Sequence, residues 1–264
     1  MNYNRIVMVF LCVVFIYSTY KIVFYFLEKD ENKRTYSVSR ELYYGDSQVE
    51  LEQATDLQPT MITMDSYESE ESEPQPIVQV KFKALLEKNQ DVVGWLKIDG
   101  TTIDYPVVQA EDNDYYLTRD VNKKKNAAGS IFMDFRSDIE SILPYTNTIV
   151  YGHRMKDGSM FGELKKYESR WQFDNYRSIE LDTLYESYEW EIFSVYITDT
   201  SLDYIQTEFS TTEDYLEFLQ LLQEKSMHES DIELSEDDIL LTLSTCSYAF
   251  DDARLAVHAR LVRN

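Results

Sequence analysis

Cysteine is nearly absent from this chain, which has only Cys12 and Cys246 among its 264 residues. Cys12 lies in an apolar N-terminal run, so the folded part of the chain cannot contain a disulfide framework. Cys246 is therefore a lone thiol. In an exported protein such a thiol is open to oxidation, which makes its presence more informative than that of a cytosolic cysteine.

Glycine and proline are also scarce, with seven and five residues, and no period of 20 to 50 residues repeats. These features exclude collagen-like, low-complexity and repeat architectures. The chain is 44% hydrophobic and contains 21 Tyr and 13 Phe, which can supply a core. We expect one folded domain with appendages.

Basic residues are few: 25 Lys and Arg stand against 48 Asp and Glu, for a formal charge of -23. Binding a polyanion depends on Lys and Arg that displace counterions, so nucleic acid is excluded as the expected partner. The acidic excess is consistent with solubility at a crowded surface.

Long hydrophobic runs are missing except for Ile6–Leu27, which only Lys21 interrupts. A helix of this length crosses ~30 Å of hydrocarbon. A cleaved signal peptide is the alternative, but the run exceeds a usual signal core and no small-x-small cleavage site follows it. We expect residues 5–27 to be a single-pass membrane anchor. Arg5 favours a cytoplasmic location for residues 1–4 and an extracellular one for the rest, although basic residues just beyond the span weaken this asymmetry.

The segment after the anchor is rich in acidic residues, with ten Asp and Glu and no Lys or Arg between residues 41 and 76. Self-repulsion keeps such a segment extended. We therefore assign residues 28–77 to an acidic extracellular linker and residues 78–264 to the folded domain.

The domain begins with a short amphipathic helix after Ile77 and continues in short β-branched or aromatic runs. The predicted strands are Gly94–Ile98, Thr102–Val108, Ser130–Asp134, Thr148–Tyr151, Ser178–Leu184, Trp190–Thr198, Ile239–Thr245 and Leu255–Val262. Further helices are predicted at Met160–Tyr167 and at Thr212–Lys225, the latter opened by a capping box from Thr211 to Asp214. Many strands with few helices indicate a mainly β fold, a closed or nearly closed barrel.

One predicted strand ends at the lone thiol, in the order Thr242-Leu243-Ser244-Thr245-Cys246. A thiol at a strand end is well placed to face a groove. The alternative is a buried small hydrophobe, which is what most free cysteines are.

This run matches the TLxTC signature of the sortase family, and Arg254 follows Cys246 by eight residues on the next predicted strand. The run Asn147-Thr148-Ile149-Val150-Tyr151-Gly152-His153 resembles the sortase strand that delivers the catalytic histidine. Class B is indicated by the helix before the barrel, by Arg154-Met155 after the histidine, by the Phe161-Gly162-Glu163-Leu164 helix and by the helix at 212–225. The resemblance implies a closed eight-stranded barrel with an N-terminal helix and further peripheral helices.

The resemblance also implies the roles of the site residues. Cys246 would be the nucleophile, His153 its acid–base partner and Arg254 the oxyanion donor. Ser244, which shares a strand face with Cys246, and Thr245 are candidate residues for binding the substrate or contacting Arg254, with a structural hydrogen bond as the alternative. The enzyme would cleave an NPxTx-like sorting motif of surface proteins after Thr and form a thioester. It would then transfer the protein to an amine of a peptidoglycan precursor or cross-bridge in a Gram-positive host.

Two other histidines compete with His153 for the partner role. His228 lies in an acidic stretch and is predicted to be a solvated loop residue. His258 would lie ~13 Å along the strand from Arg254, too far to serve the same carbonyl. No cofactor is expected, and no metal, because the acidic clusters at Glu111–Asp114 and Asp251–Asp252 lack EF-hand spacing.

Three alternatives remain open from sequence. A pilin-polymerising sortase of the same class is not separated from an anchoring sortase by the sequence. A hydrolytic cysteine peptidase would release its acyl group to water. A non-catalytic surface-binding module would carry an incidental thiol.

Overall fold

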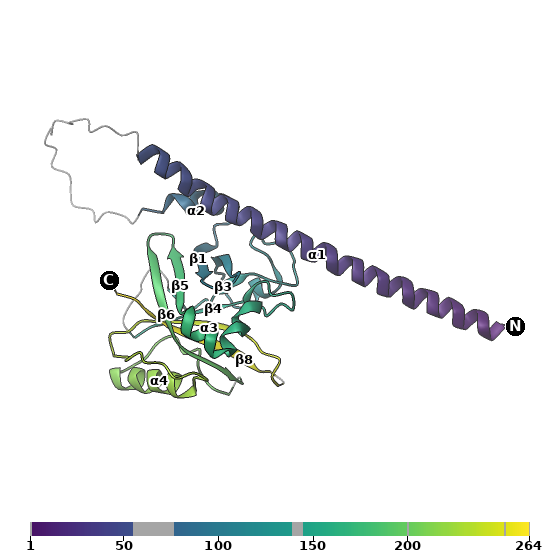
Figure 1. Cartoon of the computed structure of the whole chain (residues 1–264). Coiled ribbons are helices and arrows are strands. Elements are labelled where there is room, and N and C mark those ends of the chain that lie inside the picture. Colours follow the sequence, from purple (N-terminus) through teal and green to yellow (C-terminus); the bar gives the residue numbers. More distant parts are fainter. Residues whose placement is uncertain (1, 55–76, 139–144, 200, 251, 264) are drawn as a thin grey trace.

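The computed structural model describes residues 2–54, 77–138, 145–199, 201–250 and 252–263, and Figure 1 shows a barrel beside one long helix. The helices are α1 (Asn2–Ala54), α2 (Val80–Lys88), α3 (Arg170–Asn175) and α4 (Thr212–Lys225), with 3-10 helices η1 (Tyr115–Thr118) and η2 (Phe161–Glu168). The strands are β1 (Val92–Ile98), β2 (Asp104–Val108), β3 (Ile131–Met133), β4 (Asn147–Tyr151), β5 (Ser178–Thr183), β6 (Ser187–Thr198), β7 (Leu240–Cys246) and β8 (Arg254–Leu261).

The strands close into a barrel in the order β1-β2-β3-β4-β7-β8-β6-β5, with β5 paired back to β1. Two pairs are parallel, β2 with β3 and β4 with β7, and the remaining pairs are antiparallel. The predicted closed eight-stranded barrel is thus confirmed, with strand ends that differ by a few residues. The parallel β4–β7 pair positions the site, because parallel neighbours end on the same side of the barrel.

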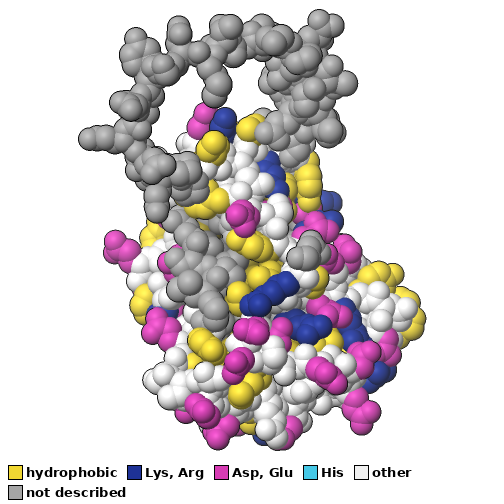
Figure 2. Space-filling view, turned by 90° about the vertical axis from the view of Figure 1, so that its left-hand side faces the viewer, with side chains coloured by type: hydrophobic (Ala, Val, Ile, Leu, Met, Phe, Trp, Pro, Cys, Tyr) yellow, Lys and Arg dark blue, Asp and Glu magenta, His cyan; other side chains and the backbone are white. Residues whose placement is uncertain are grey.

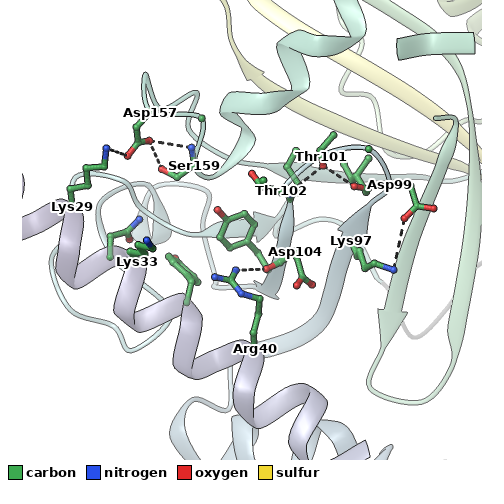
Figure 3. Close-up of a pocket in the computed structure, with 17 residues that line it drawn as sticks. Lys29, Lys33, Arg40, Lys97, Asp99, Thr101, Thr102, Asp104, Asp157 and Ser159 are labelled. Carbon is green, nitrogen blue, oxygen red and sulfur yellow. Dashed lines mark hydrogen bonds and ion pairs between the residues drawn. The ribbon is translucent and has the colours of Figure 1, made fainter. Parts of the chain in front are cut away.

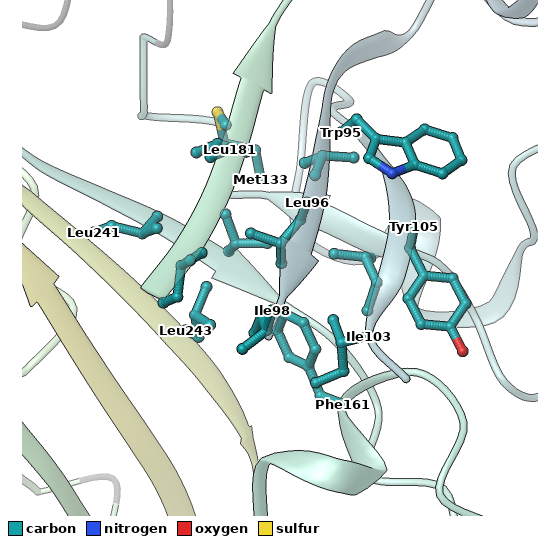
Figure 4. Packing of buried hydrophobic residues seen from close by; sticks show 14 of the residues in the cluster. Trp95, Leu96, Ile98, Ile103, Tyr105, Met133, Phe161, Leu181, Leu241 and Leu243 are labelled. Carbon is teal, nitrogen blue, oxygen red and sulfur yellow. The ribbon is translucent and has the colours of Figure 1, made fainter. Parts of the chain in front are cut away.

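The barrel interior is apolar and closely packed, as Figure 4 shows. Its side chains come from most of the strands and from η2, and they include Leu96, Ile98, Ile103, Met133, Phe161, Leu181, Leu241 and Leu243. A second buried cluster, which includes Phe193, Tyr215, Leu219 and Leu222, lies between α4 and the strands β6, β7 and β8. Strand β7 lies between the two clusters, so it is buried on both faces.

The helix predictions within the domain are confirmed at α2 and α4. The hydroxyl of Thr211 accepts a hydrogen bond from the Asp214 N–H at 3.1 Å, as the capping box predicts. The predicted helix at Met160–Tyr167 is the 3-10 helix η2, and Met160 precedes it at a φ of 54°. Helices α3 and η1 are too short to give a periodic signal and were not predicted.

Helix α1 differs most from the sequence expectation. The apolar residues from Val7 to Leu27 are exposed, and α1 is, within the described residues, the one helix long and apolar enough to span a membrane. The helix continues into the segment assigned to the linker, and this part runs beside α2 and the barrel (Figure 1). The predicted start of folded structure near Ile77 is therefore wrong, while residues 55–76 of the linker lie outside the described residues.

The packed face of α1 repeats at helical spacing. Its buried residues are Asn32, Tyr36, Ser39 and Tyr43, separated by four, three and four positions. The Tyr43 ring stacks on Trp95 at a centroid distance of 4.1 Å. Hydropathy does not predict this face, because it consists of tyrosines and small polar side chains rather than aliphatic residues. Its neighbours in the sequence include many charged residues.

Acidic and basic side chains are interspersed on the face of the barrel that Figure 2 shows, with apolar side chains between them. A mixed surface of this kind suits a soluble domain whose net charge is strongly negative.

Candidate active site

Three strand ends bring the predicted catalytic residues to one place. Tyr151 on β4 is paired with Ser244 on β7 in parallel register, so His153 and Cys246 each lie two residues beyond a matched pair. Cys246 is paired directly with Arg254 across the antiparallel β7–β8 ladder. The register alone therefore places the imidazole and guanidinium segments on either side of the thiol.

The three residues line one pocket of about 450 Å³. Its walls come from the segment before and within η1, from β3, from the end of β4, from the β6–α4 connection and from the ends of β7 and β8. The lining residues are Asn113, Asp114, Leu117, Phe132, Tyr151, Gly152, His153, Ser201, Leu202, Asp203, Tyr204, Ile205, Ser244, Thr245, Cys246 and Arg254. A cleft of this size falls within the range of ligand-binding pockets.

Cys246 is exposed, whereas the six preceding residues of β7 are buried. The alternative of a buried, inert cysteine is therefore wrong. The strand holds the thiol at the rim of the packed barrel, and solvent or a substrate can reach it.

Ser244 and Thr245 also line the pocket, but each is only 3% exposed and each makes a structural hydrogen bond. The Thr245 hydroxyl donates to the Gly152 carbonyl at 2.7 Å, and the Gly152 N–H donates to the Ser244 carbonyl at 3.3 Å. These bonds tie the end of β4 to the end of β7. The Ser244 hydroxyl lies 2.8 Å from the Tyr204 hydroxyl, which holds the β6–α4 connection over the pocket.

The orientation of His153 is set by a backbone carbonyl. Its Nε2 lies 2.8 Å from the carbonyl oxygen of Leu117, and because a carbonyl only accepts, Nε2 carries the proton of this bond. The other ring nitrogen, Nδ1, is then the one left for proton transfer. The His153 carbonyl accepts a hydrogen bond from the Phe161 N–H at 3.0 Å, which also fixes the backbone of the histidine.

Arg254 closes a tight connection from β7. Its Nη1 donates to the carbonyls of Asp252 and Ala253 at 3.1 and 3.2 Å, and Asp252 has a φ of 58°. The same connection carries Tyr248, whose ring lies 5.0 Å from the Arg154 guanidinium and whose hydroxyl donates to the Arg154 carbonyl. The segment that follows the thiol is thus anchored beside the residue that follows the histidine.

Asp134 is a supporting residue that sequence reasoning missed. Its carboxylate is fully buried and accepts hydrogen bonds from Asn113, Tyr151 and Arg136 at 3.0, 2.9 and 2.8 Å. Burial acts to raise the pKa of Asp134, but these hydrogen bonds outweigh it and the pKa is lowered. Arg136 also donates to the Ile205 carbonyl at 3.1 Å, so one carboxylate braces two walls of the pocket. The sequence feature that could have identified Asp134 is its place at the end of the otherwise mostly apolar predicted strand Ser130–Asp134.

The prediction that His228 is a solvated loop residue is wrong. The residue is 8% exposed, its Nε2 lies 2.8 Å from the Tyr167 carbonyl, and its ring packs against Phe173. His228 lies outside the pocket and has a structural role.

His258 is fully buried in a hydrogen-bonded network inside the domain. Its Nδ1 lies 2.8 Å from the Thr242 hydroxyl, and its Nε2 lies 2.9 Å from the Tyr196 hydroxyl. The Thr242 hydroxyl donates to the Asn147 side-chain oxygen at 2.7 Å, so Nδ1 carries the proton that bonds to Thr242. His258 does not line the pocket, in agreement with its exclusion as the partner of Cys246.

The burial of His258 predicts acid sensitivity. Burial lowers its pKa to about 3, below the usual value of about 6.5. The unfolded chain therefore binds a proton that the folded chain does not, and stability falls as pH drops from about 6.5 toward 3, by up to about 1.4 kcal/mol per pH unit from this group. We expect His258→Gln to flatten the decline of the unfolding free energy between pH 6.5 and 4, measured by urea denaturation. Parallel curves for the two proteins would contradict this assignment.

A second pocket, about 550 Å³, lies between α1 and the β1–β2 connection, and none of the three predicted catalytic residues lines it. Figure 3 shows Lys29, Lys33 and Arg40 of α1 along one of its walls. Lys29 pairs with Asp157 at 3.2 Å, and Arg40 donates to the Asp104 carbonyl at 3.0 Å. This pocket belongs to the contact between α1 and the barrel.

Comparisons with known proteins agree with this geometry. The family profile described as "Sortase domain" matches residues 96–262. The chain is 41% identical over 187 residues to Sortase B of Listeria monocytogenes, across 70% of this chain and 75% of that protein. Among solved structures, sortase B from B. anthracis in complex with AAEK1 aligns with a TM-score of 0.72 and 41% identity, covering 90% of this chain and 100% of that one. A Staphylococcus aureus sortase B–substrate complex aligns at 0.74 and 31%, covering 90% and 99%.

Proposed function

Because this chain belongs to the sortase family of cysteine transpeptidases, class B, we propose that it joins surface proteins to the cell wall. The substrate of the first step is an NPxTx-like sorting motif, cleaved after its Thr. The acceptor in the second step is an amine of a peptidoglycan precursor or cross-bridge.

The observation that carries this proposal is the convergence of three segments on one pocket. Cys246 is exposed and directly paired with Arg254, and His153 lies two residues beyond the end of the neighbouring parallel strand. A nucleophile, an acid–base group and a fixed cation around one cleft are what acyl transfer from a peptide requires.

In the acylation step, the Cys246 thiolate attacks the carbonyl carbon of the motif's Thr. The resulting oxyanion accepts hydrogen bonds from the Arg254 guanidinium. Protonated His153 donates its proton to the departing amine, the peptide C–N bond breaks, and a thioester forms. With Nε2 bonded to the Leu117 carbonyl, Nδ1 is the nitrogen that delivers the proton.

In the transfer step, the acceptor amine attacks the thioester carbonyl and neutral His153 takes its proton. The C–S bond breaks, Cys246 is released and a new amide forms. One amide bond is broken in the acylation step and one is formed in the transfer step, so the overall reaction needs no external energy source.

We further propose that residues 5–27 anchor the enzyme in the membrane, with residues 1–4 in the cytoplasm and the barrel outside the cell. The exposed apolar surface of α1 from Val7 to Leu27 supports this arrangement. The face of α1 from Asn32 to Tyr43 packs on the barrel, so the proposed linker is restricted to residues after this packed face.

The proposal predicts acceptor-dependent turnover. The full chain in detergent is incubated with fluorescent peptides of the NPxTx type, with and without triglycine or a cross-bridge peptide. We expect the amine to accelerate turnover and to appear in a ligated product, because aminolysis then outcompetes water at the thioester. Mass spectrometry identifies both the product and the acyl-enzyme.

A matched peptide with the motif's Thr replaced by Val serves as the substrate control. Unchanged hydrolysis with no ligated product would favour a peptidase. Ligation only to a lysine side chain of a partner surface protein would favour pilin polymerisation.

A further inference from the structure

Three residues of helix α1 form hydrogen bonds with one short segment, residues 126–130, which leads into strand β3. The Glu28 carboxylate accepts from the Ala127 N–H at 2.9 Å, and the Asn32 side-chain oxygen accepts from the Asn126 amide at 3.0 Å. The Tyr36 hydroxyl donates to the Gly129 carbonyl at 2.9 Å. These α1 residues are four apart, so one helix face holds the whole segment.

The residues that make the contacts at the middle and end of this face are buried. Asn32, Tyr36 and Asn126 are 6%, 2% and 5% exposed. The Tyr36 ring also packs edge-on against Tyr105 of β2 at a centroid distance of 5.1 Å. Burial raises the pKa of Tyr36, so its hydroxyl keeps the proton that it donates. A buried hydrogen bond of this kind is costly to lose, because the carbonyl that accepts it belongs to a buried residue.

The segment 126–130 in turn forms the back of the histidine site. A Cβ on Gly129 would lie 2.7 Å from the Leu117 carbonyl oxygen and 3.1 Å from the His153 ring carbon Cδ2. The backbone of Gly129, at a φ of 59°, therefore packs directly on the ring and on the carbonyl that orients it. The Ser130 N–H donates to the Tyr116 carbonyl at 3.0 Å, which binds this segment to η1.

Helix α1 also holds the connection that follows the histidine. Lys29 pairs with Asp157 at 3.2 Å, as Figure 3 shows. The Asp157 carboxylate in turn accepts hydrogen bonds from Ser159, and this connection leads into Phe161, whose N–H bonds to the His153 carbonyl. The histidine segment is thus braced by α1 both behind its ring and along its backbone.

We propose that α1 is a positioning element of the active site, and that Tyr36, Asn32 and Glu28 hold His153 in register with Cys246 through the segment 126–130. The inference rests on the proposed function, since it assigns His153 as the acid–base group. It makes the first turns of helix beyond the membrane span a part of the catalytic unit. Docking of α1 on the barrel then controls proton transfer at a site that α1 itself does not line.

The test compares Tyr36→Phe with Tyr44→Phe in the full chain, both in a Cys12→Ala background. Each change removes one tyrosine hydroxyl from α1, but Tyr44 is exposed and donates to the Asp104 carboxylate instead. We expect Tyr36→Phe to lower kcat/KM about 10-fold, since small misplacement of a catalytic group is costly. Tyr44→Phe should change it less than about 2-fold.

Activity alone does not separate positioning from a loss of folding, so Cys246 alkylation by iodoacetamide is measured against pH on the same proteins. We expect the alkylation profile of Tyr36→Phe to differ from that of the parent, because the segment that packs on the His153 ring is no longer held by the Tyr36 hydroxyl. The profile of Tyr44→Phe should match that of the parent. Thermal unfolding of each variant shows whether it is folded.

Should Tyr36→Phe not fold, Glu28→Ala repeats the comparison from a half-buried position, with the exposed Glu31→Ala as its charge-matched control. Equal kinetics and equal alkylation profiles within either pair overturn the inference while leaving the transpeptidase proposal intact. Absence of acceptor-dependent ligation in the parent protein overturns the proposed function instead.

Discussion

Replacement of Cys246 by alanine is expected to lower peptide cleavage and ligation by at least about 10³-fold and to eliminate the thioester acyl-enzyme. Alanine removes the sulfur that forms the covalent bond, and the remaining polar groups of the pocket cannot supply another nucleophile in its place. Turnover of the sorting-motif peptide and intact-mass detection of the acyl-enzyme measure the two effects.

Cys12→Ala is the matched control, because these two cysteines are the only ones in the chain. Cys12 is exposed on the apolar part of α1, away from the pocket. We expect this variant to retain parental kinetics. If Cys246→Ala retained cleavage, a thiol-based mechanism at Cys246 would be ruled out. Equal loss in both variants would show that the loss is not specific to Cys246.

Replacement of Arg254 by alanine is expected to lower kcat by about 10² to 10³, equivalent to about 2.7–4 kcal/mol of transition-state stabilisation. Arg254 lines the pocket from the position paired with Cys246, where the proposed mechanism places the oxyanion. Because the role is specific to the transition state, kcat should fall more than KM rises. Steady-state kinetics with the sorting-motif peptide separate the two parameters.

Arg260→Ala tests whether any arginine on the strand would matter. Arg260 lies at the far end of β8, where it pairs with Glu191 at 3.2 Å and donates to the Glu233 carbonyl. We expect a change in kcat below about 3-fold from this surface contact. Comparable losses in both variants would indicate a structural role for Arg254.

The sequence was sufficient for the architecture, and it singled out three residues that line one pocket in the structure. Strand runs such as Ile239–Thr245 follow local β propensity and turn residues, and all eight appeared in the barrel. The roles of His153, Cys246 and Arg254 came from short motifs that matched a family, and their convergence followed from strand order.

The folded structure was needed wherever side chains from distant segments meet. Asp134, whose bonds join Asn113, Tyr151 and Arg136, has no local pattern that names its partners. The docking of α1 depends on polar side chains that become buried only against the barrel, so hydropathy cannot reveal it. The chain's local preferences thus specify its strands and its reactive groups, whereas burial and long-range hydrogen bonds specify what holds those groups in place.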